Sequence, residues 1–373
     1  MSADKQMRRE VRKAGFVTEG AIIVRTLGLE GMAPPIPEGE SGIVALSPAP
    51  NGRVYGLTCG SRSHFFVYDP FPTEDFVIDI GVVGEHIIGG DVFCARDGLI
   101  YGIVSGKRDD GNVQTAMFRY DPSGDYVGLE HGMWTGAPEF ISWQLRDKGV
   151  SRLAFDPETD TAYGLILPDN VLFSYRAGSA MPNKLAHVEG RVVSPVLCVA
   201  GGVVYGVGEW GAVYRYDPED GGLERTDMAI PAGKGKEYIN EASALIYDGV
   251  SGTIYGGTSV DGYLFLIDLE KEEVVCCGKP TDQPYVRCLT VGLDGKVYGV
   301  VGQPKGGMSH LVRYNPQTGD LRDLGIPFGT ITEHWVAHEI HAMCTNRNGH
   351  IVMGENDRIS HLMIYYPAVD RRR

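Results

Sequence analysis

Short stretches of alternating or β-branched apolar residues recur along the whole chain, and turn residues separate them. The clearest stretch reads Gly-x-(Val/Ile)-Tyr-Gly, as in Gly52–Gly56 and Gly98–Gly102. A variable loop follows, and then an apolar segment that ends in Tyr-Asp-Pro, as in Phe65–Pro70 and Met117–Pro122. This pattern predicts short β-strands, and no long helical period accompanies it.

The pattern occurs seven times, although the third and seventh copies are degenerate. The repeated tyrosine, or the residue that replaces it, stands at Tyr55, Tyr101, Tyr163, Tyr205, Tyr255, Tyr298 and Val352. A unit of four short strands in roughly 40–50 residues is typical of one propeller blade. The sequence therefore predicts an all-β, seven-bladed β-propeller, 1–373, with four-stranded blades at about 40–81, 87–130, 150–190, 194–230, 243–279, 286–325 and 340–367. A linear β-solenoid is the alternative, but its repeats are usually shorter.

The seventh repeat ends before a fourth strand can form. At the other end of the chain, Val24–Gly28 matches the fourth-strand pattern seen at Leu321–Gly325. We therefore expect residues 22–28 to complete the last blade and close the ring, which removes an exposed sheet edge. Residues 1–20 are polar and charged, and we expect them to form an extension outside the repeats.

Composition narrows the function. The net charge of −14 argues against a nucleic-acid partner, which needs a basic surface. No apolar run is long enough to span a membrane, and no signal peptide is visible, so we expect a cytoplasmic protein. The seven cysteines include no CxxC pair, which favours reduced thiols. No Gly-rich phosphate loop or dinucleotide fingerprint appears, so no organic cofactor is expected.

Candidate catalytic residues cluster where the loops are long and variable, at one end of the strands. Arg287 and His341 occupy equivalent positions at the start of the first strand in neighbouring blades, near the mouth of the expected channel. A cation and an imidazole cost desolvation there unless a ligand uses them. Tyr285 and His86 are candidate acid or base groups beside them.

A metal site is a second hypothesis for the same region. His338 and His341 flank Glu339, and two imidazoles with a carboxylate can bind one divalent ion, although this is not the helical HExxH spacing. Three Ser-His pairs, at Ser63–His64, Ser309–His310 and Ser360–His361, suggest another three-histidine site. Their strands are too far apart for one ion, so we expect hydrogen bonds within or between blades.

All four tryptophans fall in the same variable segments. Aromatic rings in such loops can stack on sugars or form a protein interface, whereas the alternative is local packing. The candidate substrate-binding residues are Trp335, Trp210, Trp134, Trp143 and Arg358.

The seven repeats, the His, Arg and Tyr residues at the channel mouth and the loop tryptophans together resemble the seven-bladed propeller enzymes that act on carbohydrates. These include oligogalacturonide lyase, ulvan lyases and rhamnose–glucuronate lyases. The resemblance implies that His or Tyr acts as base or acid, and that Arg or a metal neutralises a uronate carboxylate during β-elimination. It also implies a small carbohydrate or glycoside as the substrate.

Three functions remain open at this stage. The first is a lyase, or a hydrolase, that acts on an acidic oligosaccharide or glycoside, with His341 or Tyr285 as base, Arg287 on the carboxylate and His86 or His338 as acid. The second is a non-catalytic propeller that binds a protein or glycan through the tryptophan-bearing face. The third is a metal-dependent small-molecule hydrolase or lactonase.

Overall fold

The computed structural model describes residues 15–27, 36–70, 76–124, 126–127, 132–133, 136–329 and 334–368. It divides into two compact units. The first comprises Met1–Arg25, Glu189–Asn356 and His361–Arg373, and the second comprises Thr26–Val188 and Asp357–Ser360. Within the described residues, no helix is long and apolar enough to cross a bilayer. No disulfide joins the seven cysteines.

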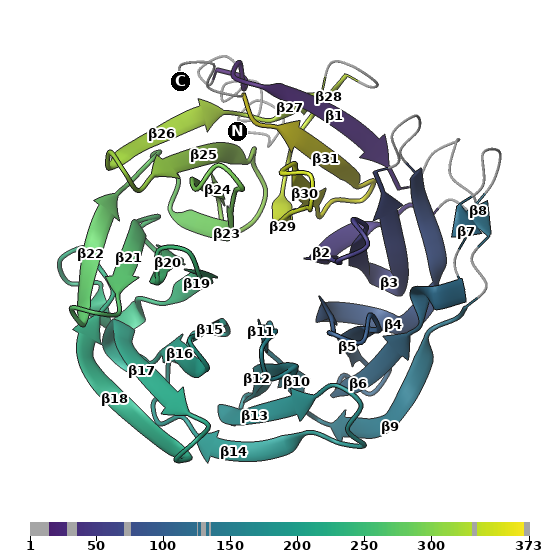
Figure 1. The fold of residues 1–373 in the computed structure, drawn as a ribbon, viewed down its shortest axis with the longest axis horizontal. Helices are drawn as coiled ribbons and strands as arrows, with labels where there is room; N and C mark the ends of the chain where they lie inside the picture. The colour runs from purple at the N-terminus through teal and green to yellow at the C-terminus, as the bar shows by residue number, and fades with distance from the viewer. Residues whose placement is uncertain are drawn as a thin grey trace. The chain divides into compact units, whose positions relative to one another are not determined.

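The first unit contains four antiparallel sheets of four strands. Their orders are β15-β16-β17-β18, β19-β20-β21-β22, β23-β24-β25-β26 and β1-β31-β30-β29 (Figure 1). The strands are β15 (Leu197–Ala200), β16 (Val203–Val207), β17 (Ala212–Asp217), β18 (Gly222–Ala229), β19 (Ala242–Asp248), β20 (Thr253–Thr258), β21 (Leu264–Asp268), β22 (Glu273–Gly278), β23 (Tyr285–Val291), β24 (Val297–Gly302), β25 (His310–Asn315), β26 (Asp320–Gly325), β29 (Ile340–Thr345), β30 (Ile351–Glu355), β31 (His361–Tyr366) and β1 (Ala21–Thr26). The minor elements are β27 (Phe328–Gly329), β28 (Trp335–Val336), η2 (Glu209–Gly211) and η3 (Glu237–Ile239).

The second unit contains a six-stranded sheet and a five-stranded sheet. The six-stranded sheet runs β2 (Gly42–Pro48), β3 (Val54–Asp69), β4 (Phe76–Cys94), β5 (Ile100–Lys107), β6 (Val113–Tyr120) and β9 (Glu139–Arg146). The five-stranded sheet contains β10 (Gly149–Val150), β11 (Ala154–Asp156), β12 (Thr161–Leu167), β13 (Val171–Arg176) and β14 (Asn183–His187). The minor elements are η1 (Pro122–Gly124), β7 (Tyr126–Val127) and β8 (Gly132–Met133).

The six-stranded sheet holds two predicted blades joined end to end. β3 spans the second and third strands of blade 1, because Ser63 and His64 bond back to Thr58 where the chain turns. β4 spans the last strand of blade 1 and the first strand of blade 2, with the turn at His86. Counted this way, the sheets give seven blades, and the predicted β-propeller fold is confirmed.

The closing strand is also confirmed. β1 pairs with β31, so the purple N-terminal strand completes the sheet of the yellow C-terminal strands (Figure 1). Ile22 and Val24 are buried in this sheet's core. The predicted end of the strand, Gly28, lies outside the described residues.

The N-terminal extension differs in part from the expectation, because its last residues join the first unit. Phe16 bridges to Ile326, and Val17 N donates to Ile326 O at 3.0 Å. Glu19 pairs with Arg313 at 2.7 Å. These contacts anchor the chain just before β1.

Side-chain packing within the blades explains why a glycine follows the tyrosine of the repeated motif. The motif tyrosines are all buried, and an aromatic ring of the next strand lies over the following glycine in several blades. A Cβ on Gly56 would lie 2.3 Å from the Phe66 ring, and one on Gly256 would lie 2.2 Å from the Phe265 ring. Only glycine leaves room for so close an approach, so each blade repeats it.

Candidate functional site

The strongest cluster of chemical groups lies at the starts of β23 and β29, which pack against each other. Arg287 on β23 extends to His341 on β29, and its Nη1 donates to His341 Nε2 in a very short contact. Arg287 Nη2 donates to the carbonyl oxygen of Gln303. The prediction that these two residues occupy equivalent, neighbouring positions is confirmed.

Glu339 adds a carboxylate to the pair. Its Oε2 lies 3.1 Å from His341 Nε2 and 3.6 Å from Arg287 Nη1. Its Oε1 accepts a hydrogen bond from the backbone N–H of Gly306, in the loop between β24 and β25. His341, Arg287 and Gly306 thus contact the carboxylate, while Asn356 N donates to the backbone carbonyl of Glu339 at 2.6 Å.

His341 Nε2 lies between two groups that need it in opposite protonation states. A guanidinium only donates and an ionised carboxylate only accepts, so Nε2 can satisfy Arg287 or Glu339 but not both. When Nε2 carries the proton it donates to Glu339, and Nδ1 then has the lone pair. The Asn356 amide approaches Nδ1 at a long 3.4 Å. Such a tautomeric balance is useful in a residue that exchanges protons.

Burial separates the members of the cluster. The Arg287 side chain is 3% exposed, whereas those of His341 and Glu339 are 29% and 22% exposed. Burial lowers the pKa of the Arg287 guanidinium, although the Glu339 charge opposes this effect. Arg287 Nε is buried and has no hydrogen-bond partner. A substrate can therefore reach the imidazole and the carboxylate more readily than the guanidinium.

Tyr285 begins β23, two residues before Arg287, and is half-buried. It therefore lies on the same strand as Arg287, whereas His86, the other candidate acid or base, belongs to the other unit.

The metal hypothesis gains no support. The described residues contain no group of three or more His, Cys, Asp or Glu side chains that could hold a metal ion. His341 Nε2 faces a guanidinium cation, which opposes a second cation. The backbone N–H of His338, the other predicted ligand, bonds to Glu355 at 2.8 Å.

The predicted substrate-binding residues are dispersed. Trp335 stacks on His361 with ring centroids 3.9 Å apart, and its Nε1 donates to Glu355 at 3.0 Å. Trp143 lies on β9, 6.2 Å from the Phe173 ring. Trp210 is 56% exposed, Arg358 is exposed and paired with Glu38, and Trp134 lies outside the described residues.

The Ser-His pairs make local hydrogen bonds, as expected. His64 Nδ1 bonds to Asp79 at 2.8 Å, and its Nε2 bonds to Glu40 at 3.0 Å. His310 Nδ1 bonds to Asp323 at 2.9 Å. The third pair is completed within its own blade, where His361 Nδ1 lies 2.9 Å from Glu355 Oε2.

Sequence reasoning missed the groups that surround the Arg287–His341 pair. The sequence indicates Glu339 only as a candidate metal ligand. The contacts from Gln303, Gly306 and Asn356 come from loops whose paths the repeat does not specify. The one available signal is that Glu339 lies two residues before His341.

No family model matches the chain, and no curated protein sequence matches it. Solved structures of similar fold include a streptogramin B lyase, with TM-score 0.62, 10% identity and coverage of 92% of this chain and 98% of that chain. A catalytically inactive His→Ala variant of virginiamycin B lyase from Staphylococcus aureus, solved with quinupristin, gives TM-score 0.60 at 8% identity, covering 92% and 100%. The RRP9 WD40 repeats give 0.58 at 13% identity, covering 94% and 99%. These likenesses support the β-propeller fold, which both enzymes and repeat proteins use.

Proposed function

We propose that this protein is a lyase that acts by β-elimination on an anionic sugar, with His341 as the general base. The observation that carries the proposal is the shared His341 Nε2, which lies between the Arg287 guanidinium and the Glu339 carboxylate. In virginiamycin B lyase, which has a similar fold, a variant with alanine in place of one histidine is catalytically inactive. That likeness supports an enzyme, but the sugar substrate rests on the chemistry of this site.

The proposed reaction begins with Nε2–H directed at Glu339. His341 Nδ1 takes the proton next to the substrate carboxylate, and the electrons of the C–H bond form an enolate. Those electrons then expel the β-oxygen, and Tyr285 gives its phenolic proton to the leaving oxygen. Glu339 stabilises the imidazolium, as the carboxylate of a His–carboxylate pair does in other enzymes.

The charge on the substrate needs a partner at the surface. Arg287 was expected to bind the carboxylate directly, but its 3% exposure leaves it little access. We propose instead that Arg287 is a positioning residue: its guanidinium lies 3.6 Å from Glu339 and holds that carboxylate beside His341. Lys305 is exposed and precedes Gly306, whose N–H binds Glu339, so it is the candidate contact for the carboxylate.

The test is to incubate the protein with a panel of uronate-containing oligosaccharides and glycosides. Elimination gives an unsaturated uronate that absorbs in the ultraviolet, and the product masses sum to that of the substrate. Hydrolysis instead adds one water. We expect His341→Ala to lower the rate by roughly 10²–10⁴-fold. The matched control is His187→Ala, an exposed histidine on β14.

The proposal fails if His341→Ala retains the activity, or if the masses show added water. Glu339→Gln separates two roles, since it keeps the shape but removes the charge. If Glu339 stabilises the imidazolium, this variant lowers kcat more than it changes KM.

A second function has one supporting observation. The exposed rings of Trp210 and Tyr238 meet edge to face with centroids 6.5 Å apart. Trp210 holds a φ of 64°, an uncommon backbone conformation for a bulky residue. Such a pair suits a binding surface for a protein or glycan, and Trp210→Ala would abolish that binding while His341→Ala would not.

A further inference from the structure

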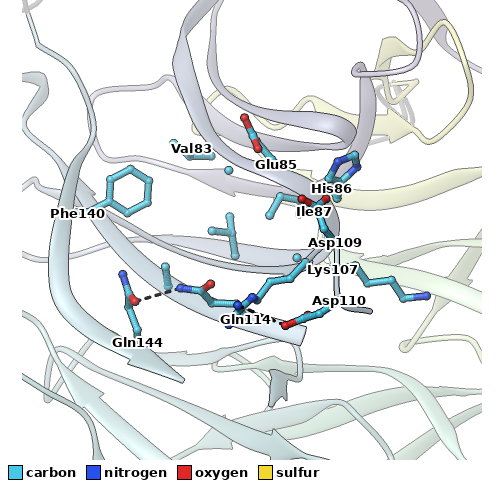
Figure 2. A pocket seen from close by; sticks show the side chains of 15 residues that line it. Val83, Glu85, His86, Ile87, Lys107, Asp109, Asp110, Gln114, Phe140 and Gln144 are labelled. Carbon is cyan, nitrogen blue, oxygen red and sulfur yellow. Dashed lines mark hydrogen bonds and ion pairs between the residues drawn. The ribbon is translucent and has the colours of Figure 1, made fainter. Parts of the chain in front are cut away.

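A pocket of about 650 Å³ lies on the second unit. Its lining contains no residue of the proposed lyase reaction. Its walls come from the turn in β4, the end of β5, and strands β6 and β9 (Figure 2). All of these elements belong to one continuous sheet. The pocket is thus built by one sheet and the loop that joins two of its strands, β5 and β6.

The floor of the pocket is apolar. Val83, Ile87 and Val104 are buried beneath it. Phe140 stands on one side with 55% of its surface exposed (Figure 2). Its ring is held edge to face by the buried Phe118, with centroids 6.4 Å apart. A large aromatic ring that is fixed yet exposed is a ready stacking platform.

Two amides stand beside this platform. Gln114 Nε2 donates to Gln144 Oε1 at 3.0 Å, from adjacent strands β6 and β9 (Figure 2). This bond uses one donor of Gln114 and one acceptor site of Gln144. The Gln114 carbonyl and the Gln144 amide N–H groups retain capacity for a ligand that offers a donor and an acceptor side by side. Two neighbouring hydroxyl groups of a sugar have this arrangement.

The opposite side is shaped by a tight turn. His86 has a φ of 50°, in the left-handed region where histidine is found more often than most non-glycine residues. A Cβ on Gly106 would lie 2.6 Å from the backbone oxygen of Glu85, so the turn and β5 pack tightly. The turn carries the exposed His86 imidazole at the rim of the pocket (Figure 2).

The charge of the lining excludes a strongly anionic ligand. Its two cations are outnumbered by three carboxylates: Lys107 and Arg108 against Glu85, Asp109 and Asp110. Arg108 is already paired with Asp110 at 3.3 Å. Carboxylates repel phosphate but accept hydrogen bonds from hydroxyls, so a saccharide fits this lining better than a nucleotide.

From these features we propose that the pocket binds one residue of a neutral saccharide. Phe140 stacks on the apolar face of the sugar ring, the paired glutamines bond to adjacent hydroxyls, and Glu85 and His86 bond to hydroxyls at the other side. The proposal does not depend on the lyase function, because it needs only binding, and it uses no residue of the Arg287–His341 cluster.

The experiment measures binding of neutral mono- and oligosaccharides, namely glucose, galactose, mannose and N-acetylglucosamine series, to the full chain by calorimetry and ligand-observed NMR. We expect saturable binding that Phe140→Ala weakens roughly tenfold, the usual worth of one stacking contact. Gln144→Ala should also weaken it, and Phe140→Trp should keep it. Leu293→Ala and Gln317→Ala, exposed residues of the first unit, serve as matched controls.

Thermal melts show whether each variant is folded, and Phe140→Trp and Gln144→Ala keep the test valid if Phe140→Ala does not fold. The proposal is overturned if none of the neutral sugars binds, or if Phe140→Ala and Gln144→Ala bind them as tightly as the unmodified chain. Binding of adenine nucleotides in their place, weakened by the same variants, overturns the saccharide class, and binding of uronates alone overturns the neutral charge of the ligand. His341→Ala must leave the binding intact, which separates this outcome from failure of the lyase proposal.

Discussion

His64 and His341 both contact carboxylates, but they differ in hydrogen bonding and in exposure to solvent. His64 bonds to Asp79 through one ring nitrogen and to Glu40 through the other. These three side chains are 5%, 8% and 10% exposed. His341 instead shares one nitrogen between a cation and a carboxylate, and it is 29% exposed. A buried histidine whose two ring nitrogens both bond to carboxylates stabilises the fold. A partly exposed histidine whose Nε2 lies between a cation and a carboxylate can exchange protons.

The pKa shifts of the charged groups also differ between the His64 cluster and the His341 cluster. Burial lowers the pKa of His64, but the hydrogen bonds and charges of Asp79 and Glu40 outweigh it and raise the pKa overall. Burial raises the pKa of Glu40, yet hydrogen bonds from Arg62, His64 and Ser61 lower it to about 2. Because both ring nitrogens face carboxylates, which only accept, the protonated form of His64 can donate an N–H to each of them. In the other cluster, burial lowers the pKa of Arg287.

The largest expected effect is on stability at His64. His64→Ala removes one partner and leaves two buried carboxylates facing each other, which we expect to cost about 3–5 kcal/mol. His341→Ala should cost less than about 1 kcal/mol, because its surroundings are partly solvated. Urea unfolding of the two variants measures both values. Equal losses of unfolding free energy in the two variants would contradict the distinction between a stabilising histidine at position 64 and a chemically active one at position 341.

Arg287 provides the next test. Arg287→Met removes one partner of a charge pair, but Glu339 is 22% exposed and Arg287 Nε is buried without a hydrogen-bond partner, so the free energy of unfolding should change by no more than about 1 kcal/mol. If the residue serves chemistry, the same variant lowers kcat of the proposed lyase reaction. Unfolding curves and initial rates on the same preparation decide this. A variant that unfolds easily would assign Arg287 a structural role.

The dependence of stability on pH sharpens the contrast. The pKa of Glu40 falls from 4.5 to about 2 on folding, so its contribution is present above pH 4.5 and is lost as the pH falls toward about 2. The pKa of His64 rises above 6.5, so its contribution is present below pH 6.5 and is lost as the pH rises through the folded value. The stabilisation of the unmodified chain over His64→Gln should therefore be greatest between about pH 4.5 and 6.5. Urea unfolding across pH checks this, and a difference that stays constant with pH would remove the charge from the explanation.

The fold was predictable because its information is local and repeated. The Tyr55–Gly56 pair recurs because an aromatic ring lies over the glycine in several blades, and β1 is recognisable as a fourth strand out of place. The Arg287–His341 contact followed from the same alignment of repeats. The Phe16–Ile326 bridge did not, since it occurs once and follows no repeat.

The rest of the site depends on loops. The positions of Gln303 and Gly306 around Arg287 and Glu339 come from loop paths that no periodic pattern encodes. Trp335 illustrates the same limit, because a loop tryptophan can face solvent or, as here, stack on a buried histidine. The pocket proposed to bind a saccharide arises where β9, which lies between the predicted blades at about 87–130 and 150–190, adds Phe140 and Gln144 beside β6.

The smallest effect is expected at His310, which begins β25 as His64 begins its own strand segment. Both histidines bond through Nδ1 to the aspartate of an Asp-x-Gly segment, but His310 has one carboxylate partner, Asp323, and the two side chains are 14% and 35% exposed. A pair this close to solvent is worth about 0.2–1 kcal/mol, so His310→Ala should lower the free energy of unfolding by no more than that. Urea unfolding beside His64→Ala gives the comparison directly. If His310→Ala lost as much free energy of unfolding as His64→Ala, the Nδ1 hydrogen bond alone would account for the stabilisation by both histidines. The second carboxylate and the deeper burial of His64 would then contribute nothing measurable.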